Sequence, residues 1–176
     1  ASGVKARYRS VDVRDEAGLG RTLDEARAEM GPVRGLIHGA GVLRDKRIED
    51  KTPAQFDEVF DTKVAGLRAL LGATARDGLK ALVLFSSVSG RYGRVGQADY
   101  AIANEALNKI AWSAASRLPG CRVSSINWGP WSGGMVTPSL LKVFEREGVG
   151  VLELGAGAAH FVSDFSAGAG SPVETV

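Results

Sequence analysis

Hydrophobic positions along the chain switch between two periods, and the switching predicts strands separated by helices. Val4–Val13 (VKARYRSVDV) has β-branched and aromatic residues in rough alternation, which is typical of a strand. A second run, ALVLF, is apolar throughout, as expected for a strand buried on both faces. The strands predicted after the first are Val33–His38, Ala81–Phe85, Arg122–Trp128 and Val173–Val176.

Between these strands the apolar residues recur at helical spacing. A charged, alanine-rich helix is predicted over Asp15–Met30 and ends at Gly31-Pro32. The next helix starts at Thr52-Pro53-Ala54-Gln55, which has the form of a capping box. Its predicted core face comprises Phe56, Val59, Phe60, Val64, Leu67 and Leu71. Further helices are predicted over Gln97–Arg117, Pro138–Glu147 and Ala156–Phe165, and loops over Ser86–Gly96 and Gly129–Gly134.

The order of these elements predicts the fold class. Strands that alternate with helices favour a doubly wound parallel α/β sheet with helices on both faces, a Rossmann-like fold. The pattern shows no internal repeat and no linker, so residues 1–176 are predicted to form a single domain.

Composition excludes several classes of function. A net charge of +2 is too small to indicate nucleic acid as a partner, and no apolar run approaches the length of about 20 residues that spans a membrane. Two histidines and one cysteine, Cys121, do not suggest a metal site or an internal disulfide. We therefore expect a cytoplasmic protein without a metal. The 23 glycines exceed the usual share and fall between the periodic segments, which favours a nucleotide site.

Polar residues gather where the predicted strands end, at the edge where open parallel sheets bind ligands. They are Asp12, the turn Gly39–Gly41, Ser86-Ser87 and the segment Asn127–Trp131. On the following helix, Tyr100 and Asn104 are four residues apart and share a face. Reduction of a ketone requires a hydride donor, an acid, a donor to the carbonyl and a cation that lowers the pKa of the acid. Tyr100, Ser87 and Lys63 could supply the last three.

The segment Ser86–Asn108 (SSVSGRYGRVGQADYAIANEALN) resembles the active-site segment of polyketide synthase ketoreductases, which are short-chain dehydrogenases. Ser87 lies 13 residues before Tyr100, and Lys63 lies 24 before Ser87. Most free-standing short-chain dehydrogenases have lysine where this chain has Asn104; the exchanged arrangement points to the synthase branch. The segments Gly35–Asp45 and Ile126–Trp131 look like the same family. The motifs GQADYAIANEALN and NWGPWSGGMV look more like iterative polyunsaturated fatty acid or enediyne synthases than the modular macrolide type.

The resemblance implies NADPH-dependent reduction of a β-ketoacyl thioester carried on an acyl carrier protein, with other synthase domains as partners. Tyr100 would be the proton donor, Ser87 the donor to the substrate carbonyl, Lys63 the group that lowers the pKa of Tyr100, and Asn104 the residue that positions the lysine or a water. The resemblance also implies the cofactor contacts Asp12, Val13, Gly39, Ala40, Gly41, Lys63, Tyr100, Gly129 and Pro130.

On the substrate side the resemblance implies contacts with Asp45, Tyr92, Gln97 and Trp131, and a lid formed by Pro138–Glu147. Ketoreductases that give D-hydroxy products carry Leu-Asp-Asp after the fourth strand, and its last Asp is diagnostic. Here the segment reads Leu43-Arg44-Asp45. Ketoreductases that give L products have tryptophan eight residues before the catalytic tyrosine, where this chain has Tyr92. These features favour a D product.

Two alternatives remain at this point. The chain could be a structural fragment of a synthase without catalytic function, or a free-standing short-chain dehydrogenase for a small alcohol or ketone. Retention of Lys63, Ser87, Tyr100 and Asn104 together weighs against the first, and asparagine at position 104 against the second. We expect a structural role for His38.

A glycine-rich phosphate turn between a strand and a helix is expected at the start of this fold, and we find none in the sequence. Its first segment resembles the third strand of the sheet. We therefore expect the C-terminal catalytic portion of a ketoreductase, incomplete at the N-terminus, without its first strand, glycine turn and helix. Residues that select NADP over NAD would also lie upstream.

This expectation gives a first prediction. Residues 1–176 on their own should not bind NADPH with micromolar affinity, because the backbone amides that hold the pyrophosphate would be missing. A fluorescence titration with NADPH measures this directly. Micromolar binding would contradict the placement of the first segment as the third strand.

Overall fold

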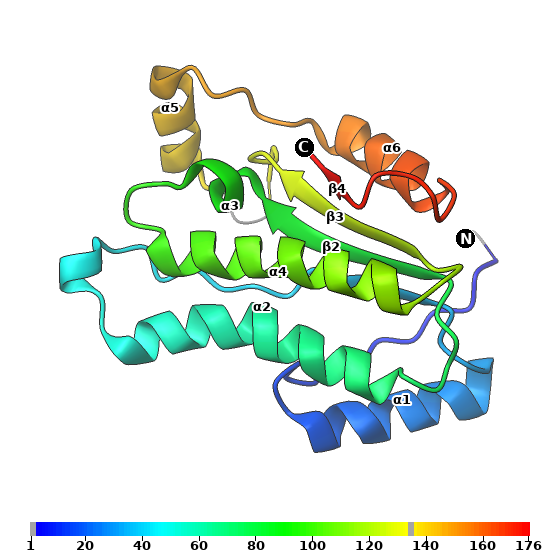
Figure 1. Ribbon diagram of the computed structural model, residues 1–176. Helices are drawn as coiled ribbons and strands as arrows, with labels where there is room; N and C mark the ends of the chain where they lie inside the picture. Colours follow the sequence, from blue (N-terminus) through cyan, green and yellow to red (C-terminus); the bar gives the residue numbers. More distant parts are fainter. Residues whose placement is uncertain (1–2, 134–135) are drawn as a thin grey trace.

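In the part of the chain that the structure describes, four parallel strands form a central sheet (Figure 1). The computed structural model describes residues 3–133 and 136–176, so Gly134 at the end of the predicted loop Gly129–Gly134 and Met135 in the motif NWGPWSGGMV lie outside the described residues. The strands follow one another in space as in sequence. They are β1 (Gly35–His38), β2 (Ala81–Ser87), β3 (Arg122–Trp128) and β4 (Glu174–Thr175).

Helices connect these strands and cover both faces of the sheet. Helices α2 and α4 pack side by side on one face, with α1 against α2, and α6 packs on the other face (Figure 1). The helices are α1 (Glu16–Met30), α2 (Pro53–Ala73), α3 (Val88–Tyr92), α4 (Ala98–Arg117), α5 (Pro138–Glu147) and α6 (Leu154–Phe165), and the 3₁₀ turn η1 comprises Ile48–Asp50. This is the predicted Rossmann-like α/β fold.

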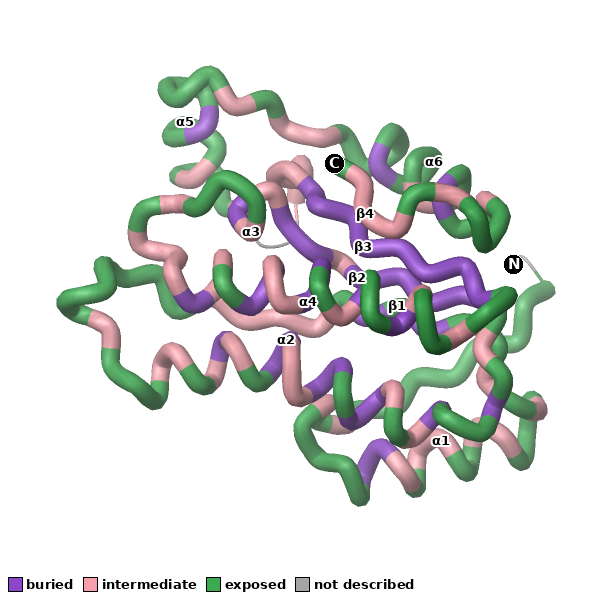
Figure 2. The backbone as a smooth tube through the Cα atoms, in the orientation of Figure 1, coloured by how far each residue is buried: buried purple, intermediate pink, exposed green. Residues whose placement is uncertain are grey.

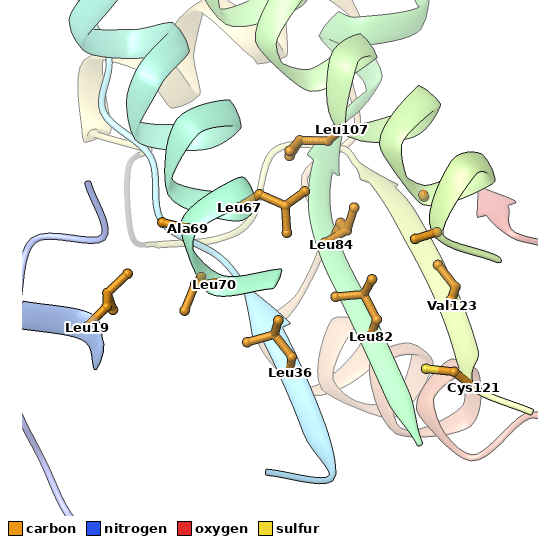
Figure 3. Packing of buried hydrophobic residues seen from close by; sticks show 12 residues of the cluster. Leu19, Leu36, Leu67, Ala69, Leu70, Leu82, Leu84, Leu107, Cys121 and Val123 are labelled. Carbon is orange, nitrogen blue, oxygen red and sulfur yellow. The ribbon is translucent and has the colours of Figure 1, made fainter. Parts of the chain in front are cut away.

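Strand β2 shows why its sequence is apolar without interruption. Successive side chains of a strand point to opposite faces of its sheet. Leu82 and Leu84 belong to the core shared with α2 and α4, together with Leu67 and Leu107 (Figure 3). Val83 belongs to the core under α6. Both faces of the strand are therefore buried, as the tube coloured by burial shows for β2 and β3 (Figure 2).

Two helix starts depend on side-chain caps that can be recognised in the sequence. At α2 the capping box is formed in both directions, because the Gln55 amide N–H donates to Thr52 Oγ1 and the Thr52 amide N–H donates to Gln55 Oε1. Asp15 caps α1 by accepting from the Gly18 amide at 3.0 Å. The capping box fixes where α2 begins, and α2 carries Lys63.

The first predicted strand is wrong. Residues 3–12 have no strand hydrogen bonds and are mostly exposed. Alternation of side chains is insufficient for a strand, since its backbone groups need a partner strand. Within the part of the chain that the structure describes, this segment has none. Lys5, Arg7 and Arg9 instead form ion pairs with glutamates of α1.

Three smaller expectations also change. The predicted loop Ser86–Gly96 contains the end of β2 and the short helix α3, because the Ser87 side chain caps α3. The last strand comprises only Glu174–Thr175. On α2 the fully buried face is centred on Val59, Leu67 and Leu70, whereas four of the predicted core residues are only partly buried: Phe56, Phe60, Val64 and Leu71.

Candidate active site

A cavity of about 460 Å³ opens at the carboxyl ends of β1, β2 and β3. Parallel strands end at the same edge of a sheet, so the segments that follow them meet there. Three of the four predicted catalytic side chains, Lys63, Ser87 and Tyr100, line this cavity. Three separate elements supply them: α2, β2 and α4.

Lys63 is buried, with 4% of its surface exposed. Its ammonium donates a hydrogen bond to the Phe85 carbonyl oxygen at 3.0 Å and lies 5.5 Å from the centre of the Tyr100 ring. Burial penalises the charged form and lowers the pKa of Lys63 to about 8. An ammonium has three N–H donors, and within the described residues one is used. The other two remain for a ligand or for Tyr100.

Tyr100 lies in the first turn of α4 with its phenol largely enclosed. Burial raises the pKa of Tyr100, while the side chains of Asn104 and Ser87 act in the opposite direction. The charge on Asp45 raises the pKa further. The phenol therefore keeps its proton near neutral pH, which is the form that an acid needs.

Ser87 ends β2, and its Oγ accepts from the Ser89 amide at 3.2 Å as the cap of α3. A hydroxyl that accepts this bond still has its own proton to donate. Capping therefore fixes the Ser87 side chain at the cavity wall and leaves its O–H available for a carbonyl oxygen.

Asn104, the fourth predicted catalytic residue, is completely buried one turn after Tyr100. Its amide Nδ2 donates to the Tyr100 carbonyl oxygen at 2.8 Å, whereas its Oδ1 is a buried acceptor without a partner among the described residues. An unpaired buried acceptor is costly, so a water is expected at Oδ1.

Of the predicted cofactor contacts, the structure places only some at the cavity. Gly39, Gly41, Gly129 and Pro130 line it, and Ala40 is not among the lining residues. A Cβ at Gly41 would approach Lys63 Cε to 3.3 Å, so glycine leaves room for the lysine stem.

Asp12 and Val13 do not line this cavity. Asp12 forms a salt bridge with Arg14 at 2.7 Å, and the hydrogen bonds from Arg14 lower its pKa to about 2. The Val13 side chain lies over Gly66 of α2, where a Cβ would approach it to 2.7 Å. Their predicted contact with the cofactor stays a prediction.

Three of the four predicted substrate residues lie at the same cavity. Tyr92, Gln97 and Trp131 line it, and Tyr92 is 80% exposed at its rim. Asp45 is not a lining residue but accepts a hydrogen bond from Gln97 Nε2 at 2.9 Å. Gln97 therefore connects Asp45 to the cavity.

The far wall of the cavity comes from α5, through Leu140 and Phe144. The Arg94 guanidinium lies 4.9 Å from the centre of the Phe144 ring and pairs with Glu147 at 3.1 Å. Sequence reasoning assigned the whole of Pro138–Glu147 to a lid but did not single out these residues. The amphipathic pattern of that helix was the signal that could have found them.

His38 is buried at the end of β1. Its Nε2 is 2.9 Å from the Lys63 carbonyl oxygen, so it has a partner, in the backbone of α2. Burial lowers the pKa of His38 to about 4. A neutral imidazole that holds the turn carrying Lys63 is consistent with the structural role assigned to it.

The residues at the cavity fit the reactive end of a nicotinamide cofactor. Glycines at 39, 41 and 129 let a flat ring approach the backbone, and a Cβ at Gly129 would meet no atom within 4 Å. Lys63 lines the cavity and, among the described residues, has spare N–H donors that the hydroxyl groups of a ribose could accept.

Comparison with known proteins shows which family this chain is similar to. A family model described as "KR domain" matches residues 1–133. The chain is 50% identical over 159 residues to a polyunsaturated fatty acid synthase protein of Thraustochytrium sp. (90% of this chain, 6% of that protein). It is 41% identical over 134 residues to erythronolide synthase EryA3 of Saccharopolyspora erythraea (76% of this chain, 4% of that protein).

Among solved structures, the chain matches the ketoreductase PlmKR1 from the first module of phoslactomycin biosynthesis in Streptomyces sp. HK803. The TM-score is 0.89 at 32% identity, covering 98% of this chain and 39% of that one. The chain therefore belongs to the KR domain family, the ketoreductase domains of polyketide synthases. Its greater identity to the polyunsaturated fatty acid synthase than to the erythronolide synthase agrees with the predicted branch. The chain spans a small part of the curated relatives that it matches.

Among the residues that the structure describes, no helix combines the length and the apolar character needed to cross a membrane.

The burial of Lys63 gives a prediction about stability. Lys63→Met should stabilise the fold at pH 7 by up to about 3 kcal/mol, because methionine removes a buried charge whose pKa falls from 10.5 to about 8. Between pH 8 and 10.5 the folded state loses this proton before the unfolded state does. Wild-type stability therefore rises with pH and the advantage of methionine shrinks.

Unfolding midpoints of the intact protein across this pH range test the prediction. Lys109→Met is the control, because the Lys109 side chain is 63% exposed on α4 and should give no such gain. A gain from Lys63→Met that stays constant from pH 7 to 10.5 would contradict the argument.

Proposed function

We propose that this chain reduces a β-ketoacyl thioester, carried on an acyl carrier protein, to the β-hydroxyacyl thioester with NADPH, within a larger synthase. The observation that carries the proposal is the convergence of Lys63, Ser87 and Tyr100 on one cavity. Membership in the KR domain family supports ketoreduction. Relatives such as erythronolide synthase EryA3, of which this chain covers 4%, support synthase domains as partners.

Each side chain has a role that its environment supports. Ser87 donates its free O–H to the ketone oxygen, which orients the carbonyl. Tyr100 gives its phenolic proton to the oxygen as negative charge develops there. The Lys63 ammonium beside the Tyr100 ring stabilises the phenolate that remains. A bound NADPH supplies the hydride.

Asn104 does not line the cavity and supports Tyr100 from the interior. Its Nδ2 holds the Tyr100 backbone, and its unpaired Oδ1 can accept from a water that returns a proton towards Tyr100. Gly129 and Pro130 would contact the nicotinamide face of the cofactor, Gly39–Gly41 its backbone, and Asp12 and Val13 its adenine. Trp131 and the wall from α5 would enclose the acyl group, and α5 would act as a lid.

Substitution of Tyr100 tests the chemistry. Tyr100→Phe should lower kcat by about 10²–10⁴, the range for loss of a general acid, and Ser87→Ala by a smaller factor. Both variants should still bind NADPH. The measurement is NADPH consumption by the intact protein on a simple β-ketoacyl thioester. Tyr8→Phe, at a position 86% exposed and far from the chemistry in sequence, is the control. Near-normal turnover of the Tyr100→Phe variant would show that Tyr100 is not the proton donor.

The configuration of the product is a separate prediction. Asp45 is held at the cavity through Gln97, and Tyr92 stands where L-producing ketoreductases have tryptophan. We expect the D-3-hydroxyacyl product. Chiral chromatography of the product made by the intact protein from a β-ketoacyl thioester decides this. A predominantly L product would show that the Leu-Asp-Asp fingerprint does not apply when its second residue is Arg44.

A further inference from the structure

A buried ion pair lies directly beside the proposed proton donor. Lys51, between η1 and α2, pairs with Asp99, the second residue of α4, at a distance of 2.7 Å between Nζ and Oδ2. Their side chains are 3% and 1% exposed. Neither residue lines the cavity, so neither belongs to the group of side chains that would touch a substrate.

Both partners of the pair are bonded a second time, each next to a residue of the site. Lys51 Nζ also donates to the Arg44 carbonyl oxygen at 2.6 Å, and residue 45 follows directly. The other carboxylate oxygen of Asp99 accepts from the Tyr100 amide at 2.9 Å. The pair therefore bridges the backbone at Arg44 and the backbone at Tyr100.

Two more bonds join the same two segments. The Lys46 amide donates to the Gly96 carbonyl oxygen, and Gln97 Nε2 donates to Asp45, both at 2.9 Å. The segment after β1 is thus fastened to the start of α4 at several points, with the ion pair as the buried one. A shift of this segment would move Asp45 relative to Tyr100.

A buried ion pair contributes little net stability to the contact between two segments. Desolvation of the two charges offsets most of their attraction, and apolar side chains of similar volume often stabilise a fold equally or more. What the charges add is direction, because an ammonium and a carboxylate have a limited set of favourable hydrogen-bond geometries. The pair is therefore suited to fixing positions.

We propose that the Lys51–Asp99 pair is a positioning element for ketoreduction, which holds the segment carrying Asp45 and the turn carrying Tyr100 in a fixed mutual position. The proposal rests on the function proposed above. The pair influences turnover and the D-to-L ratio of the product without contacting the substrate or the cofactor.

The test uses the double variant Lys51→Met/Asp99→Asn in the intact protein. Lys51→Met alone leaves a buried carboxylate without its partner and is expected to destabilise the fold. The double variant carries no lone charge, and asparagine retains an oxygen for the Tyr100 amide. We expect it to remain folded, with kcat lowered about 10- to 100-fold because a small misplacement of reacting groups is costly. Its KM for NADPH should change little, and its product should contain more of the minor enantiomer.

Asp164→Asn is the control for the loss of a buried ion pair away from the cavity. Asp164 forms the other strongly buried ion pair among the described residues, with Arg122 at 2.7 Å and side chains 6% and 5% exposed. Arg122 starts β3 at the end opposite to the cavity. The Asp164→Asn variant should be less stable than the wild-type protein, but its product ratio should equal the wild-type value.

Amide hydrogen exchange provides a readout that does not require turnover. Residues 44–47 and 98–101 should exchange faster in the double variant and at the wild-type rate in Asp164→Asn. Wild-type kcat and product ratio in a folded double variant, or unchanged exchange in both segments, would each overturn the positioning role. An inactive wild-type protein would instead refute the proposed function, and the exchange data would still decide the role of the pair.

Discussion

The placement of α4 on the sheet depends on a buried polar seam, and the site depends on α4. Asn127 Oδ1 of β3 accepts from Ser86 Oγ and Asn108 Nδ2, and Ser125 Oγ donates to Asn108 Oδ1 at 2.7 Å. Each of these groups would cost about 1–3 kcal/mol if it were left unpaired in the interior. Leucine and alanine contacts tolerate a small rotation of a helix, but this seam does not. These hydrogen bonds therefore fix the position of α4 along its axis and its rotation about that axis, and with them the position of Tyr100.

Two buried lysines near Tyr100 illustrate how environment separates a structural role from a chemical one. Lys51 has a carboxylate partner, and its charge is neutralised within the fold. Lys63 has a carbonyl oxygen as its partner, and its desolvated ammonium keeps a lowered pKa beside the Tyr100 ring. Within the part of the chain that the structure describes, Lys63 has no counter-ion. Such a buried charge is destabilising, so its retention is better explained by chemistry than by stability. The unmet acceptor of Asn104 supports the same interpretation.

Local physics accounts for most of the elements that sequence reasoning predicted correctly. The strand at Arg122–Trp128 and the helix at Pro138–Glu147 have the predicted bounds, and the capping box starts α2 where Thr52 predicts it. The side-chain period and the caps that indicate these elements can be recognised within a few residues. A strand also needs partner strands, which β3 has in β2 and β4 and which Val4–Val13 lacks among the described residues.

The sequence by itself determined the α/β class, the family resemblance and the spacing that links Lys63, Ser87 and Tyr100, since periodicity and motif spacing are properties of the chain alone. Only the tertiary structure decided that these side chains share one cavity, that Asp12 and Val13 lie outside it, and that Lys51 reaches Asp99 across 48 residues of sequence. The reason is physical. An ion pair, a cavity wall and a buried seam each require segments that become neighbours only when the sheet and its helices pack, and no local pattern encodes which distant residue will be the partner.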